Sequence, residues 1–224
     1  MERLGSGVHR GGDMSRAGGF RLLAITDRLG VLSGRSLVSA VAAALAGGVD
    51  AVQLREKDLP DVELVALAAE LRALTSRHGA ALLINGRPDI AREIGTDGVH
   101  LPSAIAEVRA ARAVLGGGGI VGVSTHALAD VAAAHADGAD YVTFGPVFAT
   151  PSKAAFGEPL GLSALREACA SVSMPVFSLG GVRPELAAEI TACGARIAAI
   201  SALLHAPDPT AAAESFLARM GARA

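Results

Sequence analysis

The fold is decided by residues 174–204, which read MPVFSLGGVRPELAAEITACGARIAAISALL. A short apolar run ends at Gly180 and Gly181, and a helix-like run follows. A second apolar run ends at Ile200 and Ser201. Glycines let the backbone approach a ligand closely, and a helix N-terminus offers free N–H groups to an anion. The stretch predicts strand, turn, helix and strand, with a phosphate bound at the two strand ends; an ordinary tight turn is the alternative.

The same alternation extends through most of the chain. Short apolar runs alternate with helix-like segments, and eight of the runs are predicted strands: residues 20–26, 49–54, 81–85, 98–101, 120–124, 141–145, 176–179 and 197–201. Strands that alternate with helices imply parallel pairing and right-handed crossovers. The sequence therefore predicts an α/β fold, a single (β/α)₈ TIM barrel over residues 20–224, with a doubly wound open sheet as the alternative.

A weak internal repeat favours the barrel. A glycine, a small or β-branched residue and a polar residue precede every second strand, as Gly48-Val49-Asp50, Gly95-Thr96-Asp97, Gly138-Ala139-Asp140 and Gly194-Ala195-Arg196. We expect each glycine to end a helix in the left-handed conformation and each polar residue to lie at the bottom rim. This pattern predicts a contribution to stability rather than to catalysis.

Composition excludes several classes of protein. Apolar residues make up 51% of the 224 residues, the net charge is −2 and Trp is absent, so neither disorder nor nucleic-acid binding is expected. Residues 1–19 are predicted to be a flexible leader, with Met14 as an alternative start. No signal peptide or membrane span is expected, and the predicted location is cytoplasmic. Cys169 and Cys193 have no metal-site spacing and are expected to be free thiols.

Polar residues follow the second and third predicted strands, at the end where barrels place their sites. Gln53, Arg55 and Lys57 share one face if the extended chain continues past the strand. An amide and two cations suit an anionic substrate rich in heteroatoms, and a solvated loop is the alternative. Asn85 could bind a heterocycle through its paired donor and acceptor, or form an Asn-Gly turn with Gly86.

Further candidates follow the later strands. His100 is expected to be a packed or hydrogen-bonded histidine. His126 lies just beyond the fifth strand and could carry a proton, and Ser124, two residues before it, is a candidate substrate contact. The long loop over residues 146–159 suggests a lid over an anion, or a solvated loop; its candidate substrate contacts are Thr150, Ser152 and Lys153.

Taken together, these residues resemble the superfamily of thiamine phosphate synthases and thiazole tautomerases. The resemblance runs from about Arg21 to the last helix. The motifs that carry it are residues 53–57 (QLREK), Asn85, residues 97–101 (DGVHL), 123–126 (VSTH), 138–142 (GADYV), 145–148 (GPVF) and 150–153 (TPSK), Pro175, Gly180–Gly181 and Ile200–Ser201.

The resemblance implies a TIM barrel and assigns roles to matching positions. In the synthases, the positions that hold an aminopyrimidine diphosphate match Gln53, Arg55, Lys57 and Asn85. Those that surround the lid and a thiazole phosphate match Thr150, Ser152, Lys153, Gly181 and Ser201. The synthases also use Mg²⁺, bound through two aspartates, whereas this chain has Gly86 at one position and residues 102–105 (PSAI), including Ile105, at the other. Asp89 is left as a carboxylate that could reach a metal.

The missing aspartates favour the tautomerase branch, because Mg²⁺ needs carboxylate oxygens that Gly86 and Ile105 cannot supply. The leading prediction is therefore a thiazole tautomerase, an isomerase that needs no cofactor, with His126 as the catalytic proton carrier. The first alternative is a thiamine phosphate synthase with Mg²⁺; the second is a regulator that binds thiazole phosphate without catalysis. The expected partner is a small phosphorylated heterocycle, with no nucleic acid or membrane, and a homo-oligomer stays open.

Overall fold

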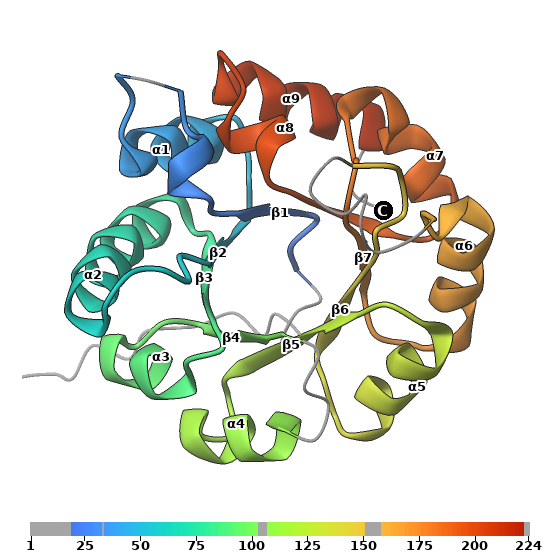
Figure 1. Ribbon diagram of the computed structural model, residues 1–224, viewed down its shortest axis with the longest axis horizontal. Helices are drawn as coiled ribbons and strands as arrows, with labels where there is room; N and C mark the ends of the chain where they lie inside the picture. Colours follow the sequence, from blue (N-terminus) through green and yellow to red (C-terminus); the bar gives the residue numbers. More distant parts are fainter. Residues whose placement is uncertain (1–18, 33, 103–106, 151–157, 222–224) are drawn as a thin grey trace, which may run out of the picture.

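The structure is a computed structural model that describes residues 19–32, 34–102, 107–150 and 158–221. Eight parallel strands close into a barrel, and each strand pairs with the next until the last pairs with the first. Figure 1 shows the ring of strands inside a ring of helices. The strands are β1 (Leu22–Ile25), β2 (Ala51–Leu54), β3 (Ala81–Asn85), β4 (Gly98–Leu101), β5 (Ile120–Thr125), β6 (Tyr141–Phe144), β7 (Val176–Ser178) and β8 (Arg196–Ala199). The predicted TIM barrel is confirmed, and the open sheet is wrong.

The helices cover the outside of the barrel. They are η1 (Arg28–Gly30), α1 (Leu37–Ala46), α2 (Asp61–His78), α3 (Pro88–Ile94), α4 (Val108–Leu115), α5 (Leu128–Ala136), α6 (Gly161–Ser171), η4 (Pro184–Leu186), α7 (Ala187–Ala192), α8 (Ser201–Leu204) and α9 (Pro209–Met220). Ser201, expected to end the last strand, begins α8 instead. Among the described residues, no helix has both the length and the apolar character needed to cross a bilayer. Residues 1–18 of the predicted leader lie outside the described part of the chain.

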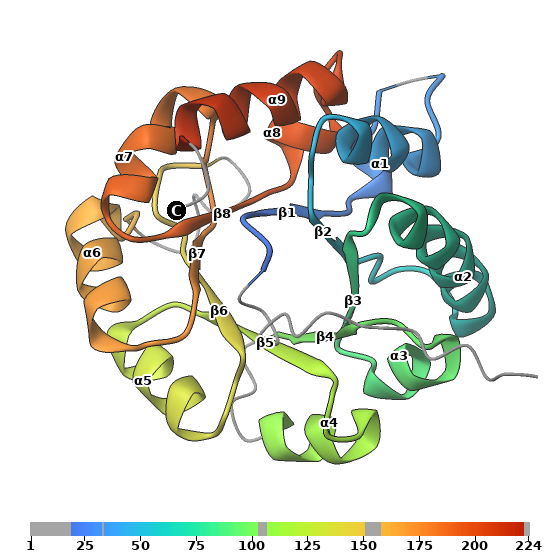
Figure 2. The same ribbon diagram turned by 180° about the vertical axis from the view of Figure 1, so that it is seen from behind.

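Side chains alternate along each strand and form two apolar regions. One lies between the strands and the helices. The other fills the barrel, where the Phe20 ring packs against Tyr141 and Phe177 with centroids 5.5 and 5.3 Å apart. Figures 1 and 2 both show the described segment before β1 inside the ring of strands. The barrel is thus packed with side chains below its mouth.

The bottom rim carries the predicted repeat. Its glycines have positive φ angles: Gly48 +100°, Gly95 +70°, Gly138 +83° and Gly194 +85°. A residue with a side chain rarely adopts this conformation, so the glycines permit the turn into each strand. The sequence prediction is confirmed for these turns.

The polar residue of each repeat binds the backbone of the preceding strand or segment. Asp50 accepts from the Arg21 and Leu22 N–H groups, with the shortest distances at 2.9 Å. Asp97 accepts from Leu82 N–H at 2.7 Å, and Asp140 accepts from Val121 N–H at 2.8 Å. Arg196, the basic member, donates instead to the Phe20 carbonyl at 2.6 Å. These bonds tie neighbouring strands together at the end opposite the mouth.

Candidate functional site

Gln53 and Asn85 form the polar floor of the mouth, at the C-terminal ends of β2 and β3. The Gln53 side chain is 2% exposed, and its Nε2 donates to Asn85 Oδ1 at 3.0 Å. Gln53 Oε1 is buried and accepts no hydrogen bond from any described residue. A buried acceptor without a partner is costly, and most such groups are satisfied. Gln53 therefore presents an acceptor that an N–H donor on a ligand could satisfy.

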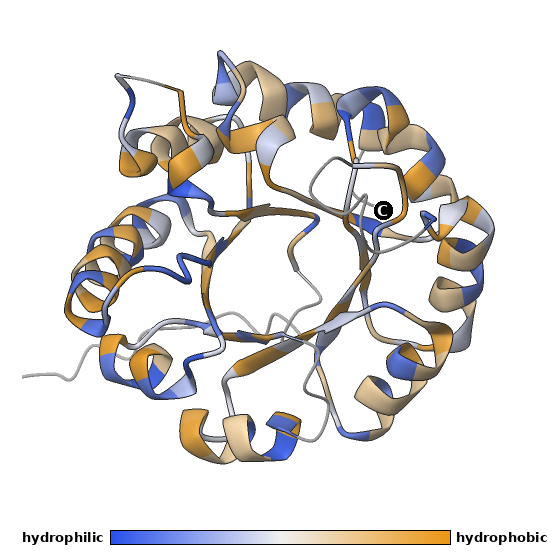
Figure 3. Ribbon diagram, in the orientation of Figure 1, coloured by the Kyte–Doolittle hydropathy of each residue, from blue (hydrophilic) through white to orange (hydrophobic). Residues whose placement is uncertain are grey.

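Two cations follow Gln53 beyond the end of β2. The Arg55 backbone N–H donates to Thr26 Oγ1 at 2.8 Å, while its half-buried guanidinium has no ion pair or hydrogen bond with another described residue. Lys57 is exposed and is likewise unpaired within the described ranges. Figure 3 shows hydrophilic residues along the segment from β2 to α2 that carries both. This edge of the mouth can receive a multiply charged anion.

Glu56, between these cations, serves the scaffold. It is 6% exposed, and its carboxylate oxygens accept from the Arg28 N–H at 3.1 and 3.2 Å. This contact fixes the segment that contains η1 against the end of β2. Glu56 thus has a structural partner, whereas the cations on either side of it form no ion pair with another described residue.

His100, on β4, lies inside the barrel in a hydrogen-bonded network. Its Nδ1 lies 2.8 Å from the Tyr141 hydroxyl oxygen, and its Nε2 lies 2.9 Å from Ser124 Oγ. Burial lowers the pKa of His100 to about 3, and the charge of Arg55 lowers it further. The ring is therefore neutral at physiological pH. Ser124 is half-buried at the end of β5 and connects this network to the mouth.

His126 is exposed just after β5. Its Nδ1 lies 2.6 Å from the Gly145 carbonyl oxygen. A carbonyl oxygen only accepts, so Nδ1 of His126 carries the hydrogen. In the neutral ring, Nε2 then has a free lone pair and can accept a hydrogen bond. The bond anchors the chain where β6 leads toward the expected lid.

The glycine turn after β7 packs against the loop after β6. Gly180 and Gly181 have φ angles of +90° and +65°. A Cβ atom on Gly180 would lie 2.7 Å from Pro146 Cα, and one on Gly181 would lie 2.5 Å from the Ala149 carbonyl oxygen. Close backbone approach thus requires both glycines. The backbone that approaches these glycines belongs to the protein's own loop after β6, so phosphate binding at the turn stays a prediction.

The remaining predicted contacts are only partly described. Ile200 precedes α8 and Ser201 is its exposed first residue, beside the glycine turn because β7 and β8 pair. Thr150 is half-buried at the end of a described range. Ser152 and Lys153 lie outside the described residues, so the lid stays a prediction.

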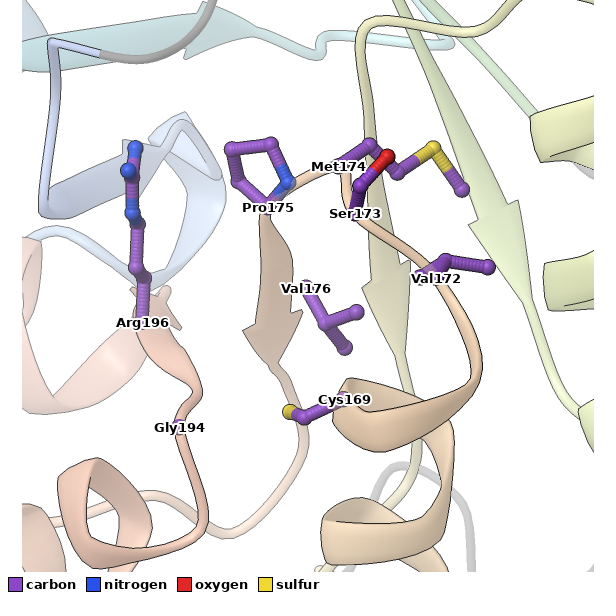
Figure 4. A pocket seen from close by; sticks show the side chains of 8 residues that line it. All are labelled: Cys169, Val172, Ser173, Met174, Pro175, Val176, Gly194 and Arg196. Atoms are coloured by element: carbon purple, nitrogen blue, oxygen red, sulfur yellow. The ribbon is translucent and has the colours of Figure 1, made fainter.

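A separate hollow of about 230 Å³ lies at the opposite end of the barrel. It is bounded by the end of α6 and the residues that enter β7 and β8 (Figure 4). Both thiols are free; burial raises the pKa of Cys169, which lines this hollow, to about 11, so it is protonated at neutral pH. A barrel places its chemistry at the C-terminal strand ends, so we assign the site to the mouth.

The described carboxylates do not fit a protein-bound divalent cation at the mouth. Gly86 has no side chain, and Ile105 lies outside the described residues. Asp89 and Asp61 both pair with Arg87, and the hydrogen bond from Arg87 lowers the pKa of each. Among the described residues, no three His, Cys, Asp or Glu side chains are grouped to hold a metal. Mg²⁺ prefers carboxylate and phosphate oxygens, and the described part of the mouth supplies no group of carboxylates for it.

The profile of the family described as thiamine monophosphate synthase matches residues 22–203. The chain belongs to this family. It is 49% identical over 205 residues to a putative thiamine-phosphate synthase of Geobacter sulfurreducens, covering 91% of this chain and 96% of the relative. It is 43% identical over 190 residues to the thiamine-phosphate synthase of Moorella thermoacetica, covering 84% and 90%.

Solved structures agree with the sequence relatives. Thiamine phosphate pyrophosphorylase from Pyrococcus furiosus superposes with a TM-score of 0.81 at 32% identity, covering 90% of this chain and 95% of that one. Membership of the thiamine monophosphate synthase family is thus supported by sequence over the whole barrel and by its three-dimensional arrangement.

These relatives overturn the leading prediction of a thiazole tautomerase, an isomerase. Proteins 43 to 49% identical to this chain carry the name thiamine-phosphate synthase, a transferase, which supports the first alternative. The prediction gave two positions, Gly86 and Ile105, more weight than the rest of the mouth. Those positions bear on metal binding alone, whereas the resemblance of Arg55-Glu56-Lys57 to the synthases extends over another part of the mouth.

Sequence reasoning also missed Tyr141 as part of the polar network. The sequence places Tyr141 in the family motif over residues 138–142 and in a predicted strand, and neither assignment predicts a polar contact. A signal was present in Gly122, a glycine inside the neighbouring strand, since such a residue often marks close approach of another group.

Proposed function

We propose that this protein is a thiamine-phosphate synthase, which joins an aminopyrimidine diphosphate to a thiazole phosphate. A bond forms between the thiazole nitrogen and the methylene carbon of the pyrimidine. The bond from that carbon to the diphosphate oxygen breaks, and diphosphate leaves with the electron pair. The observation that carries the proposal is the combination at the mouth of the buried Gln53 acceptor with the cations Arg55 and Lys57, none of which has a side-chain partner among the described residues.

Gln53 and Asn85 would bind the pyrimidine. An exocyclic amine is an N–H donor, and Gln53 Oε1 is a buried acceptor that lacks one among the described residues. Asn85 Oδ1 already accepts from Gln53, which leaves the Asn85 amide hydrogens for acceptors on the ring. Binding thus gives the buried Gln53 acceptor a hydrogen-bond partner that no described residue supplies.

Arg55 and Lys57 would bind the diphosphate. Charge-assisted hydrogen bonds to phosphate oxygens are the strong ones, and Arg can form two at once. Their effect grows as the carbon–oxygen bond breaks, because negative charge then builds up on the leaving group. Arg55 and Lys57 are thus the chain's own contribution to the departure of diphosphate.

The thiazole phosphate would bind across the mouth, at the ends of β6, β7 and β8. Its proposed contacts are Gly180, Gly181, Ile200 and Ser201, with Thr150, Ser152 and Lys153 from the loop after β6. The side-by-side pairing of β7 and β8 supports this grouping. We propose His126 as a positioning residue of the site, because it holds Gly145 at the start of that loop.

The test is turnover by the purified full chain. Both substrates are mixed with the protein in the presence of Mg²⁺, and thiamine phosphate and diphosphate are measured by mass spectrometry. We expect the two products in equal amounts, and none when either substrate is omitted. A folded protein that forms no thiamine phosphate under these conditions contradicts the proposal. A homo-oligomer and a cytoplasmic location stay predictions.

A further inference from the structure

One row of residues crosses three neighbouring strands below the mouth. His100 on β4 pairs in register with Gly122 on β5, and Gly122 pairs with Tyr141 on β6. A Cβ atom on Gly122 would overlap the Tyr141 ring. The glycine therefore lets the tyrosine ring lean across β5 toward the histidine. The two ring centroids lie 5.5 Å apart.

The row ends in a chain of hydrogen bonds that leads to the mouth. The Tyr141 hydroxyl lies 2.8 Å from His100 Nδ1, and His100 Nε2 lies 2.9 Å from Ser124 Oγ. Tyr141 and His100 are buried, with exposures of 0% and 2%. Ser124 is half-buried and is the end of this hydrogen-bonded chain nearest the mouth.

The direction of these bonds follows from counting protons. Burial keeps both rings neutral, because it lowers the pKa of His100 to about 3 and raises that of Tyr141 well above its usual value. A neutral imidazole has one N–H group and one acceptor. If His100 Nδ1 carried the hydrogen, the Tyr141 O–H would be buried without an acceptor among the described residues, which costs about 1–3 kcal/mol.

The opposite arrangement satisfies every group. Tyr141 donates to Nδ1, so the hydrogen of His100 is on Nε2 and is donated to Ser124 Oγ. The Ser124 oxygen then already accepts from the protein, and its own hydrogen is left for the mouth.

We propose that Tyr141 is a positioning residue that holds His100 in the Nε2–H tautomer and thereby makes Ser124 a hydrogen-bond donor toward the ligand. Asn85 pairs in register with His100, so the Ser124 donor and the Gln53 acceptor belong to adjoining polar groups around one mouth. A donor and an acceptor match a ring nitrogen and an exocyclic amine of an aminopyrimidine. The ligand part of the inference rests on the proposed function, whereas the tautomer part does not.

The tautomer is read directly by nitrogen-15 NMR of the full chain with labelled histidine. We expect His100 to carry its hydrogen on Nε2 in the wild type, and to shift to a mixture of tautomers in Tyr141→Phe, which keeps the ring but removes the hydroxyl. A hydrogen on Nδ1 in the wild type, or an unchanged tautomer in Tyr141→Phe, would overturn the inference. This readout stands even if the protein shows no synthase turnover.

Kinetics test the link to the ligand. Ser124→Ala should raise KM for the aminopyrimidine diphosphate about tenfold, the loss expected for one hydrogen bond, with a smaller change in kcat. Tyr141→Phe should raise the same KM by a smaller factor, because part of the protein keeps the Nε2–H tautomer and with it the Ser124 donor. The double variant should be no worse than Ser124→Ala alone, because both changes act on the same donor. Additive losses would contradict a role through Ser124.

A matched control separates positioning from packing. Phe20→Leu removes a ring that packs against Tyr141 without a contact to His100 in the described network. We expect it to lower the urea midpoint while leaving KM and the His100 tautomer unchanged. A KM change as large as that of Tyr141→Phe would assign the tyrosine a packing role and overturn the proposal.

Discussion

The two ends of the barrel use polar residues in opposite ways. At the bottom rim, Asp50, Asp97 and Asp140 accept hydrogen bonds from the backbone of neighbouring strands or segments, and Arg196 donates to a carbonyl. At the mouth, Gln53 Oε1 is buried without a described partner. The same barrel thus has polar groups that the protein itself satisfies at one end and, at the other end, a buried acceptor that no described residue satisfies.

This difference separates stability from function. A carboxylate that pairs with backbone N–H groups stabilises the fold, and its loss leaves those groups unsatisfied. A cation or amide that forms its hydrogen bonds with a ligand contributes to binding instead. Substitutions at the two ends should therefore change different measurements, and each prediction below tests that separation.

The largest effect is expected for Arg55→Ala. The variant loses the half-buried cation at the mouth, so we expect kcat/KM for thiamine phosphate formation to fall about a hundredfold or more. The urea midpoint should stay near that of the wild type. The matched control is Arg109→Ala on α4, whose guanidinium is exposed and pairs with Asp137. Equal activities of the two variants would contradict the assignment.

A loss of stability is expected for Asp140→Ala. Its carboxylate, which is 11% exposed, accepts from Val121 N–H and from Arg112. The variant removes the side-chain acceptor of Val121 N–H and the ion pair of Arg112, which keeps its bonds to the Gly119 and Gly138 carbonyls. We expect unfolding free energy to fall by about 2–3 kcal/mol in urea titrations. The kcat/KM of the folded variant should match that of the wild type. A tenfold loss of kcat/KM would contradict the separation of stability at the bottom rim from function at the mouth.

A pH dependence of stability is expected from His100. Its pKa is about 3 in the folded protein and 6.5 in the reference state, so between these values the unfolded chain binds a proton that the folded chain does not. Stability should therefore fall as pH drops below about 6.5, by about 1.4 kcal/mol per pH unit from this group. His100→Gln should show a shallower fall between about pH 6.5 and 5 in urea midpoints. Parallel slopes would contradict a neutral buried His100.

The smallest effect is expected for Gly86→Asp. Asp tolerates the positive φ of +66° better than most residues, and an added Cβ would meet only the Pro102 ring, with Cδ at 3.7 Å and Cγ at 3.9 Å, both ordinary contacts. The variant adds a carboxylate to the mouth, so we expect the Mg²⁺ concentration for half-maximal turnover to fall several-fold. Calorimetry with Mg²⁺ alone gives a second readout. An unchanged requirement would show that position 86 does not face the diphosphate.

The barrel and its bottom rim could be predicted from local sequence. Apolar runs at regular intervals define the strands, and a glycine followed by Asp50, Asp97 or Asp140 marks three strand entries, because both signals lie within a few residues. The inward position of Gln53 follows from the period of a strand, whereas β2 ends at Leu54 and the shared face of Arg55 and Lys57 stays a prediction.

The network at the mouth could not be predicted in the same way. The contact from Tyr141 to His100 depends on the register of β4, β5 and β6, which one sequence does not determine. The pairing of Arg87 with Asp61 depends on how α2 and α3 pack. The prediction of a tautomerase is wrong because the missing carboxylates at positions 86 and 105 do not by themselves decide between the two activities.

The most direct test is calorimetric binding of the aminopyrimidine diphosphate to three forms of the full chain. We predict saturable binding to the wild type, binding about tenfold weaker to Gln53→Ala at the mouth, and wild-type affinity in folded Asp140→Ala at the bottom rim. No binding to the wild type, or equal affinity of Gln53→Ala and wild type, would contradict the assignment of the mouth as the pyrimidine site.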